Sequence, residues 1–78
     1  MIRREMKLVI TFHTTTEAMT MEYACKTENA PGRLIPVPRE ISAGCGMAWS
    51  AEPGAEEILQ DLMVQNGIVP QALQVCLV

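Results

Sequence analysis

KLVITF, residues 7–12, is the stretch of sequence that decides the fold. Leu8, Ile10 and Phe12 take alternate positions in it, so their side chains point to the same face of an extended chain. This alternation is typical of a β-strand that has one face on a hydrophobic core. We therefore predict a first strand at residues 7–12, and the other elements are found by working outward from it.

A capping box indicates a helix directly after this strand. Thr14 precedes Glu17 by three residues, so the hydroxyl and the carboxylate are placed to bond each other's backbone N–H groups. Asn29 and Pro31 indicate the end of the helix, because proline cannot continue the turn. The sequence predicts a helix at residues 15–28 with an inward stripe made of Ala18, Met21 and Cys25.

The next part of the chain predicts two strands joined by a loop. Residues 32–37 (GRLIPV) are predicted to form the second strand. Pro36 places it at an edge of the sheet, because proline has no N–H to donate to a neighbouring strand. Residues 47–50 predict a short third strand. We expect residues 38–46 to be a loop, or a loop with one helical turn at residues 39–42.

A second amphipathic helix follows. Pro53 suits its first turn, and Asn66-Gly67 supplies its C-terminal cap. Residues 73–78 alternate again and predict a fourth strand. The apolar residues of the helix recur at helical spacing and are expected to face the core: Ala55, Ile58, Leu59, Leu62 and Met63.

The order strand, helix, strand, strand, helix, strand predicts an α+β fold. Its simplest closure is a ferredoxin-like βαββαβ sandwich, with both helices on one face of a four-stranded antiparallel sheet. We expect a single domain over residues 1–78, with residues 1–6 as a flexible N-terminal extension. The helix-free face would carry an apolar patch, and hence a possible homodimer surface, made of Val9, Ile35, Cys76 and Val78.

Composition excludes several classes of function. The net charge of −3, with six scattered Lys and Arg residues, argues against a nucleic-acid-binding face. No apolar run approaches the roughly 20 residues of a membrane span, and residues 1–7 lack the apolar stretch of a signal peptide. We expect a cytoplasmic protein without a membrane partner, in which the three cysteines stay reduced. Their spacing predicts no metal site, and we expect no cofactor.

Cys45 is the residue best placed for chemistry. It lies in the expected loop between Gly44 and Gly46, which leave room for a bulky partner to approach the sulfur. A reactive cysteine needs nearby positive charge or backbone donors, because the thiolate is the nucleophile. Arg39 is the first candidate for that charge. The plainer interpretation, a turn that holds a small residue, stays open.

Three residues are further candidates. Arg33 is a second source of positive charge for the thiolate, and Ser42 joins the two glycines as a candidate binding residue. His13 is the single imidazole of the chain, and it can act as a base if its loop meets the Cys45 loop. A loop histidine is more often simply solvated.

The other two cysteines and the tryptophan are expected to have packing roles. Cys25 lies on the inward stripe of the first helix, and Cys76 alternates on the fourth strand, where a cysteine behaves as a small hydrophobe. Trp49, beside the loop, is expected to pack against a helix.

Two runs of this sequence, VITFHTTTEAM (residues 9–19) and PGRLIPVPREISAGCGMAW (residues 31–49), resemble a small bacterial family of selenium/sulfur carrier-like proteins. The resemblance extends from residue 7 to the last strand. It implies that Cys45 carries sulfur or selenium as a persulfide or selenopersulfide, with Arg39 in support. It also implies a non-catalytic carrier with two partner proteins: a cysteine desulfurase-like or selenium donor, and an acceptor.

Two other functions remain as alternatives. The same element order occurs in domains that bind small ligands such as amino acids at dimer interfaces, so a regulatory module is one of them. A redox sensor is the other, in which Cys45 forms a disulfide with Cys25 or Cys76. That bond needs Cα atoms within roughly 7 Å of each other.

Overall fold

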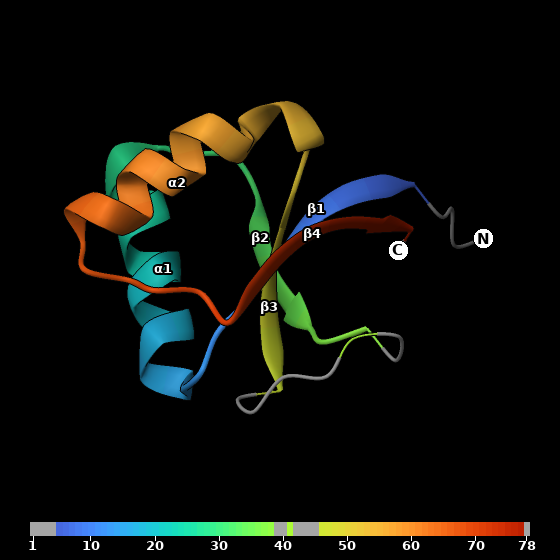
Figure 1. Cartoon of the computed structure of the whole chain (residues 1–78). Coiled ribbons are helices and arrows are strands. Elements are labelled where there is room, and N and C mark those ends of the chain that lie inside the picture. The colour runs from blue at the N-terminus through green and yellow to red at the C-terminus, as the bar shows by residue number, and fades with distance from the viewer. Residues whose placement is uncertain (1–4, 39–40, 42–45, 78) are drawn as a thin grey trace.

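The computed structural model describes residues 5–38, 41 and 46–77, while residues 1–4, 39–40, 42–45 and 78 lie outside the description. Each expected strand and helix forms, with ends that differ by a residue or two at most of them (Figure 1). The elements are, in order, β1 (Met6–Thr11), α1 (Thr15–Glu28), β2 (Arg33–Pro36), β3 (Met47–Ala51), the 3₁₀ turn η1 (Pro53–Ala55), α2 (Glu56–Gln65) and β4 (Ala72–Leu77).

Strands β3 and β1 form the centre of the sheet. The strand order is β2-β3-β1-β4, and every neighbouring pair is antiparallel. Figure 1 shows α1 and α2 together on one face of this sheet. The fold is therefore the expected ferredoxin-like α+β sandwich. Strand β2 lies at an edge, as Pro36 predicts.

Helix α1 begins and ends as the sequence predicts. The Glu17 N–H donates a hydrogen bond of 3.2 Å to the hydroxyl of Thr14, which caps the helix. Asn29 has a φ of 56°, a left-handed conformation in which its N–H reaches the carbonyl groups of Cys25 and Lys26. The chain then leaves the helix at Ala30 and turns back into β2.

The hydrophobic core fills the space between the helices and the sheet. Leu8, Ile10 and Phe12 are fully buried there, as their alternation predicts. In contrast, Ile58 of α2 was expected to face this core and is 58% exposed. Successive helical residues are rotated by about 100°, and the buried stripe of α2 is centred on Leu59, so Ile58 falls at its margin.

The helix-free face of the sheet differs from expectation at its centre. Val9 lies on this face as predicted, but it is fully buried between Ser50 of β3 and Gln74 of β4 in the strand register. Ile35 and Cys76 share the face and are half-buried, and Val78 lies outside the described residues. The exposed apolar patch expected around Val9 is therefore not present among the described residues of this face.

Membrane insertion through a helix is not supported in the described part of the chain. Neither α1 nor α2, nor any other helical segment there, combines the length and apolar character that crossing a bilayer requires.

Candidate functional site

The β2–β3 hairpin presents the expected loop. Strand register places Pro36 opposite Met47, and beyond this pair the Val37 N–H donates a hydrogen bond of 3.1 Å to the carbonyl of Gly46. Further along, the Ile41 N–H donates to the Pro38 carbonyl at 3.0 Å. The hairpin is thus closed at its base by backbone bonds. Four predicted site residues of this loop lie outside the described residues: Arg39, Ser42, Gly44 and Cys45.

Gly46 is exposed at the base of the hairpin. Its φ of 76° lies in the left-handed region, which side chains other than glycine adopt at a free-energy cost. Among the described residues, nothing lies within 4 Å of a Cβ atom added at Gly46. In this part of the chain the glycine is therefore required by its backbone conformation and not by a neighbour.

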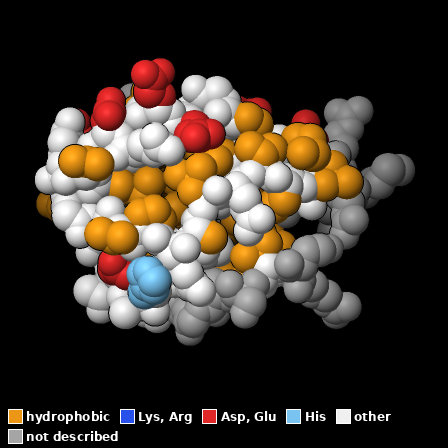
Figure 2. All heavy atoms as spheres, viewed as in Figure 1, with side chains coloured by type: hydrophobic (Ala, Val, Ile, Leu, Met, Phe, Trp, Pro, Cys, Tyr) orange, Lys and Arg blue, Asp and Glu red, His pale blue; other side chains and the backbone are white. Residues whose placement is uncertain are grey.

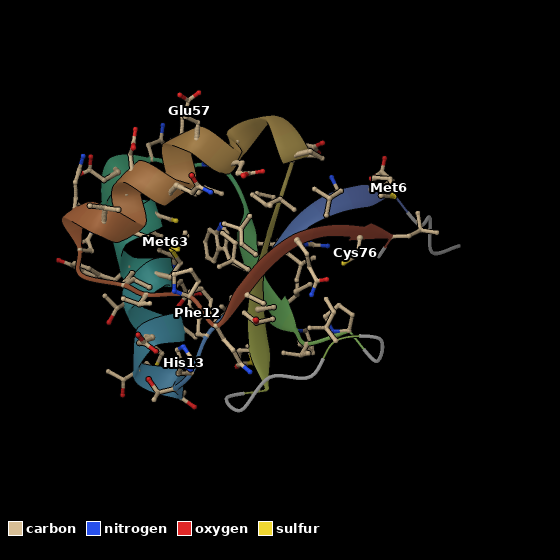
Figure 3. The ribbon with its side chains drawn as sticks, in the orientation of Figure 1. Met6, Phe12, His13, Glu57, Met63 and Cys76 are labelled. Atoms are coloured by element: carbon tan, nitrogen blue, oxygen red, sulfur yellow. The ribbon has the colours of Figure 1, made fainter. Side chains whose placement is uncertain are left out.

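His13 lies at the same end of the sheet as this hairpin base. Thr11, the last residue of β1, pairs with Ala48, which lies two residues after Gly46. Figure 3 shows His13 beyond the end of β1, next to the start of α1, and its side chain is exposed. A role for this imidazole at the Cys45 loop stays a prediction.

Arg33 lies at the other end of β2. It pairs with Ser50 and is exposed, whereas the hairpin base begins after Pro36. The arginine also lines a cavity of about 370 Å³ beside the α1–β2 connection, together with Cys25 and other residues. The structure therefore associates Arg33 with the start of the strand more closely than with the loop.

Cys25 and Cys76 lie on opposite sides of the sheet. Cys25 is 2% exposed in the core under α1, and burial raises the pKa of its thiol to about 11. Cys76 pairs with Lys7 on the helix-free face and is half-buried. Cys25 is therefore a packing residue, as expected, and its thiol is not activated.

Comparison with protein families identifies relatives of the chain. A family model described as "Putative Se/S carrier protein-like" matches residues 7–74, which is most of the chain. The chain belongs to this family. Comparison with the curated proteins and with the solved structures gives no match.

One close contact of this Se/S carrier-like protein was not foreseen from the sequence. A Cβ atom on Gly32, whose φ is 112°, would lie 2.3 Å from Nε1 of Trp49 and 2.7 Å from the carbonyl oxygen of Ser50. The same Nε1 donates a hydrogen bond of 3.1 Å to the Pro31 carbonyl. Trp49 thus packs as expected, but it also holds the start of β2. In the sequence, the Pro31-Gly32 pair indicates a turn, but it does not indicate that Trp49 packs against that turn.

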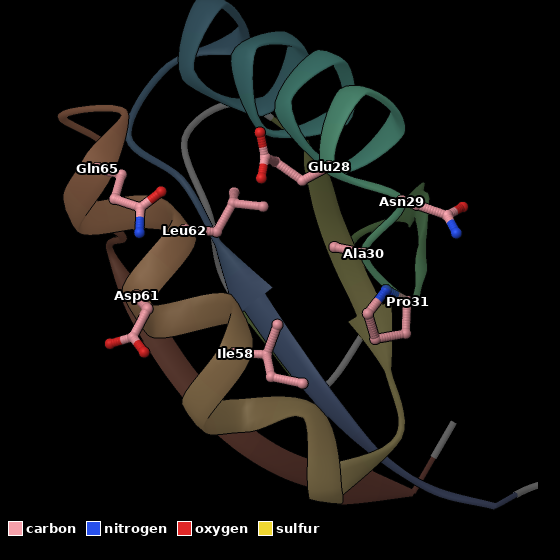
Figure 4. Close-up of a pocket in the computed structure, with 8 residues that line it drawn as sticks. All are labelled: Glu28, Asn29, Ala30, Pro31, Ile58, Asp61, Leu62 and Gln65. Carbon is pink, nitrogen blue, oxygen red and sulfur yellow. The ribbon is translucent and has the colours of Figure 1, made fainter.

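The Se/S carrier-like domain also has a cavity away from the hairpin. Its volume is about 400 Å³, and it lies between α2 and the end of α1 (Figure 4). Ile58 and Leu62 line one side, while Glu28 and Pro31 line the other. None of the predicted site residues contributes to it. Among the described residues, no three side chains of metal-binding type come together.

Proposed function

We propose that this protein carries sulfur or selenium on Cys45, as a persulfide or a selenopersulfide, between a donor and an acceptor protein. The observation that carries the proposal is membership of the Se/S carrier-like family over residues 7–74. The geometry of the hairpin supports it, because the Val37–Gly46 bond ties the base of the loop to a rigid sheet and no described residue crowds Gly46.

Loading is a thiol exchange at sulfur. The Cys45 thiolate attacks the outer sulfur or selenium atom of a persulfide or selenopersulfide on the donor protein. The new bond forms at Cys45 while the donor's own bond to that atom breaks, and the electron pair leaves with the donor's inner sulfur as a thiolate. The outer atom keeps its proton, so the step requires no oxidant or reductant. An acceptor thiolate then removes the atom from Cys45 in the same way.

The proposed roles of the neighbouring residues follow from charge and position. Arg39 stabilises the Cys45 thiolate as the nearest cation in the sequence, and Arg33 is a secondary candidate from the far end of β2. His13 is proposed as a proton acceptor for the thiol, supported by its position two residues beyond the Thr11–Ala48 pair, at the same end of the sheet as Gly46. Three further residues of the loop are proposed to contact the partner protein: Ser42, Gly44 and Gly46.

The proposal implies protein partners and no turnover of a free substrate. A cysteine desulfurase-like or selenium donor loads the thiol, and a second protein accepts the atom. We place the exchange in the cytoplasm, where persulfides and free thiols persist under reducing conditions. The acidic pI of about 4.9 favours partners with a basic docking face.

Intact-mass measurement tests the carrier function. The protein is incubated with a cysteine desulfurase and cysteine, then analysed without reductant. We expect a species heavier by one sulfur atom, which disappears on treatment with dithiothreitol. Cys45→Ser should remain unloaded, whereas the matched control Cys76→Ser, at a half-buried thiol on β4, should load like the wild type.

Three results would contradict the proposal. The wild type fails to gain sulfur under conditions in which the desulfurase itself is loaded, or Cys45→Ser gains as much sulfur as the wild type. A transfer that requires Cys25 would also contradict it, because that thiol is buried in the core.

A further inference from the structure

The two edges of the sheet differ in how they are protected. An edge strand presents unpaired N–H and C=O groups, which proteins usually shield with charged residues or proline. Strand β2 has both, since Arg33 begins it and Pro36 ends it. Strand β4 (Ala72–Leu77) has neither a charged residue nor a proline in its sequence ALQVCL. The β4 edge is therefore open to pairing with another strand.

Exposed apolar side chains accompany this open edge. Val75 and Leu77 of β4 are 44% and 47% exposed, and Met6, which pairs with Leu77, is 54% exposed. The register puts these residues on the same face as the core residue Leu8. Figure 1 shows why they stay exposed, because β1 and β4 extend past the helices at this end.

The described residues on this side of the molecule present no cation to the viewer of Figure 2. In Figure 2, hydrophobic side chains gather across the middle of the face, acidic side chains lie mainly along its upper margin over α2, and no Lys or Arg side chain is seen. Met6 and Cys76, labelled in Figure 3, mark the end of the sheet to which this surface extends. An apolar, uncharged strand fits this edge, because β4 offers it apolar side chains and no charge.

We propose that β4 pairs with β4 of a second copy of this chain. A second copy fits because its own β4 is equally apolar and uncharged, so the edges meet without like-charge repulsion even though each chain has a net charge of −3. The two-fold register with Val75 opposite its own copy also places Leu73 opposite Leu77, so apolar residues match on the face of the sheet that carries the exposed side chains. On the other face, the uncharged Gln74 lies opposite Cys76. The result is a continuous sheet with four strands from each copy.

This dimer leaves the hairpin of each copy accessible. Strand β4 and strand β2 lie at opposite edges of the sheet, and the β2–β3 hairpin base is bordered by Val37 and Gly46 at the β2 side. The interface consists of one strand pair and three exposed apolar side chains per copy, which is at the small end of specific interfaces. We therefore expect a dissociation constant on the order of micromolar to tens of micromolar.

Sedimentation velocity over a range of concentrations tests the dimer. Measurements run from about 1 µM to about 1 mM, on either side of that expected constant, with reductant present so that no disulfide contributes. The wild type should change from 8.6 kDa to twice that mass as concentration rises. Val75→Lys should stay monomeric, whereas Val64→Lys, at an apolar residue of α2 that is 79% exposed and off this edge, should dimerise normally.

Hydrogen exchange of the backbone amides tests the same dimer in the wild type, without any substitution. In the wild type, the backbone amides of β4 should exchange more slowly at high than at low concentration, while those of β2 should not change. A wild type that stays monomeric at about 1 mM overturns the proposal. So does a Val75→Lys variant that is folded by circular dichroism and dimerises as the wild type does, or β4 amides that exchange independently of concentration.

Discussion

Strand β2 has a glycine near each of its ends, and the two ends have different surroundings among the described residues. On the side of α1, Cys25 is buried and Gly32 lies against Trp49. On the side of the hairpin, Gly46 has a positive φ like Gly32, but no described residue lies within 4 Å of where its side chain would be. A positive φ thus accompanies close packing at one end, and no crowding by the described residues at the other.

Gly32 and Gly46 are thus required to be glycine for two different reasons. At Gly32 both the φ of 112° and the contact with Trp49 exclude a side chain, so the residue is part of the core architecture. At Gly46 only the φ of 76° matters. A glycine that is required without being crowded leaves a surface that a partner can reach, which is the property expected beside a carrier thiol.

The largest expected effect is at Gly32. Gly32→Ala should lower the free energy of unfolding by about 3 kcal/mol or more, because the added Cβ meets Trp49 and Ser50 at sub-contact distances in a strained conformation. Urea unfolding followed by far-UV circular dichroism measures the change. Gly54→Ala is the control, since Gly54 has open space and no positive φ, and it should change stability by less than about 1 kcal/mol. Equal effects at the two sites would contradict the close contact at Gly32.

The next effect concerns the buried thiol at the same end. Cys25 has a pKa raised to about 11 by burial, so the folded protein keeps this thiol neutral where the unfolded chain ionises it. The stabilisation is complete below the unfolded value of 9.0 and is lost as pH rises to about 11, by on the order of 2 kcal/mol. Cys25→Ala should remove this component, seen as the difference between the urea-unfolding curves of the two proteins from pH 8 to 11. If the stability difference between wild type and Cys25→Ala does not change with pH, the raised pKa of Cys25 is contradicted.

A smaller effect is expected at the indole of Trp49. Trp49→Phe removes the hydrogen bond to the Pro31 carbonyl and should lower stability by about 1–2 kcal/mol. It also removes the nearest atom to a Cβ at position 32, so the double variant with Gly32→Ala should be less destabilised than the sum of the two single changes. Strict additivity, measured by circular dichroism, would show that the clash with Trp49 is not what excludes a side chain at Gly32.

The smallest effect is expected at the hairpin. Gly46→Ala should lower the free energy of unfolding by about 1 kcal/mol, from backbone strain alone, because no neighbour is displaced. Gly46→Asn should recover part of this loss, since asparagine tolerates the left-handed conformation better than alanine. A loss as large as that of Gly32→Ala would mean that Gly46 is crowded and would remove the contrast between the two ends.

The elements of the fold were accessible from local patterns. The Thr14 cap, the stop at Asn29 and the edge position of Pro36 are each properties of a few neighbouring residues, and each is confirmed. The burial of Cys25 followed from helical spacing in the same way. For the candidate site, the sequence points to Cys45 and its loop, and the structure adds the hairpin base that supports it.

Other features depend on contacts between distant segments. The exposure of Ile58 depends on how α2 rotates against the sheet, and the burial of Val9 depends on the strands on both sides of it. The position of His13 at the same end of the sheet as Gly46 follows from the pairing of β1 with β3, which has no signature in either segment alone. A one-residue change in register would turn every side chain of a strand to the other face.

The sequence by itself therefore determined the order of the elements, the helix caps, the edge strand and the family, because these depend on spacing and residue type along the chain. Only the tertiary structure decided that Gly32 lies under Trp49 while no described residue crowds Gly46, and that β4 is an unprotected apolar edge. The physical reason is that burial and access are set by what packs from elsewhere in the chain, which local periodicity does not specify.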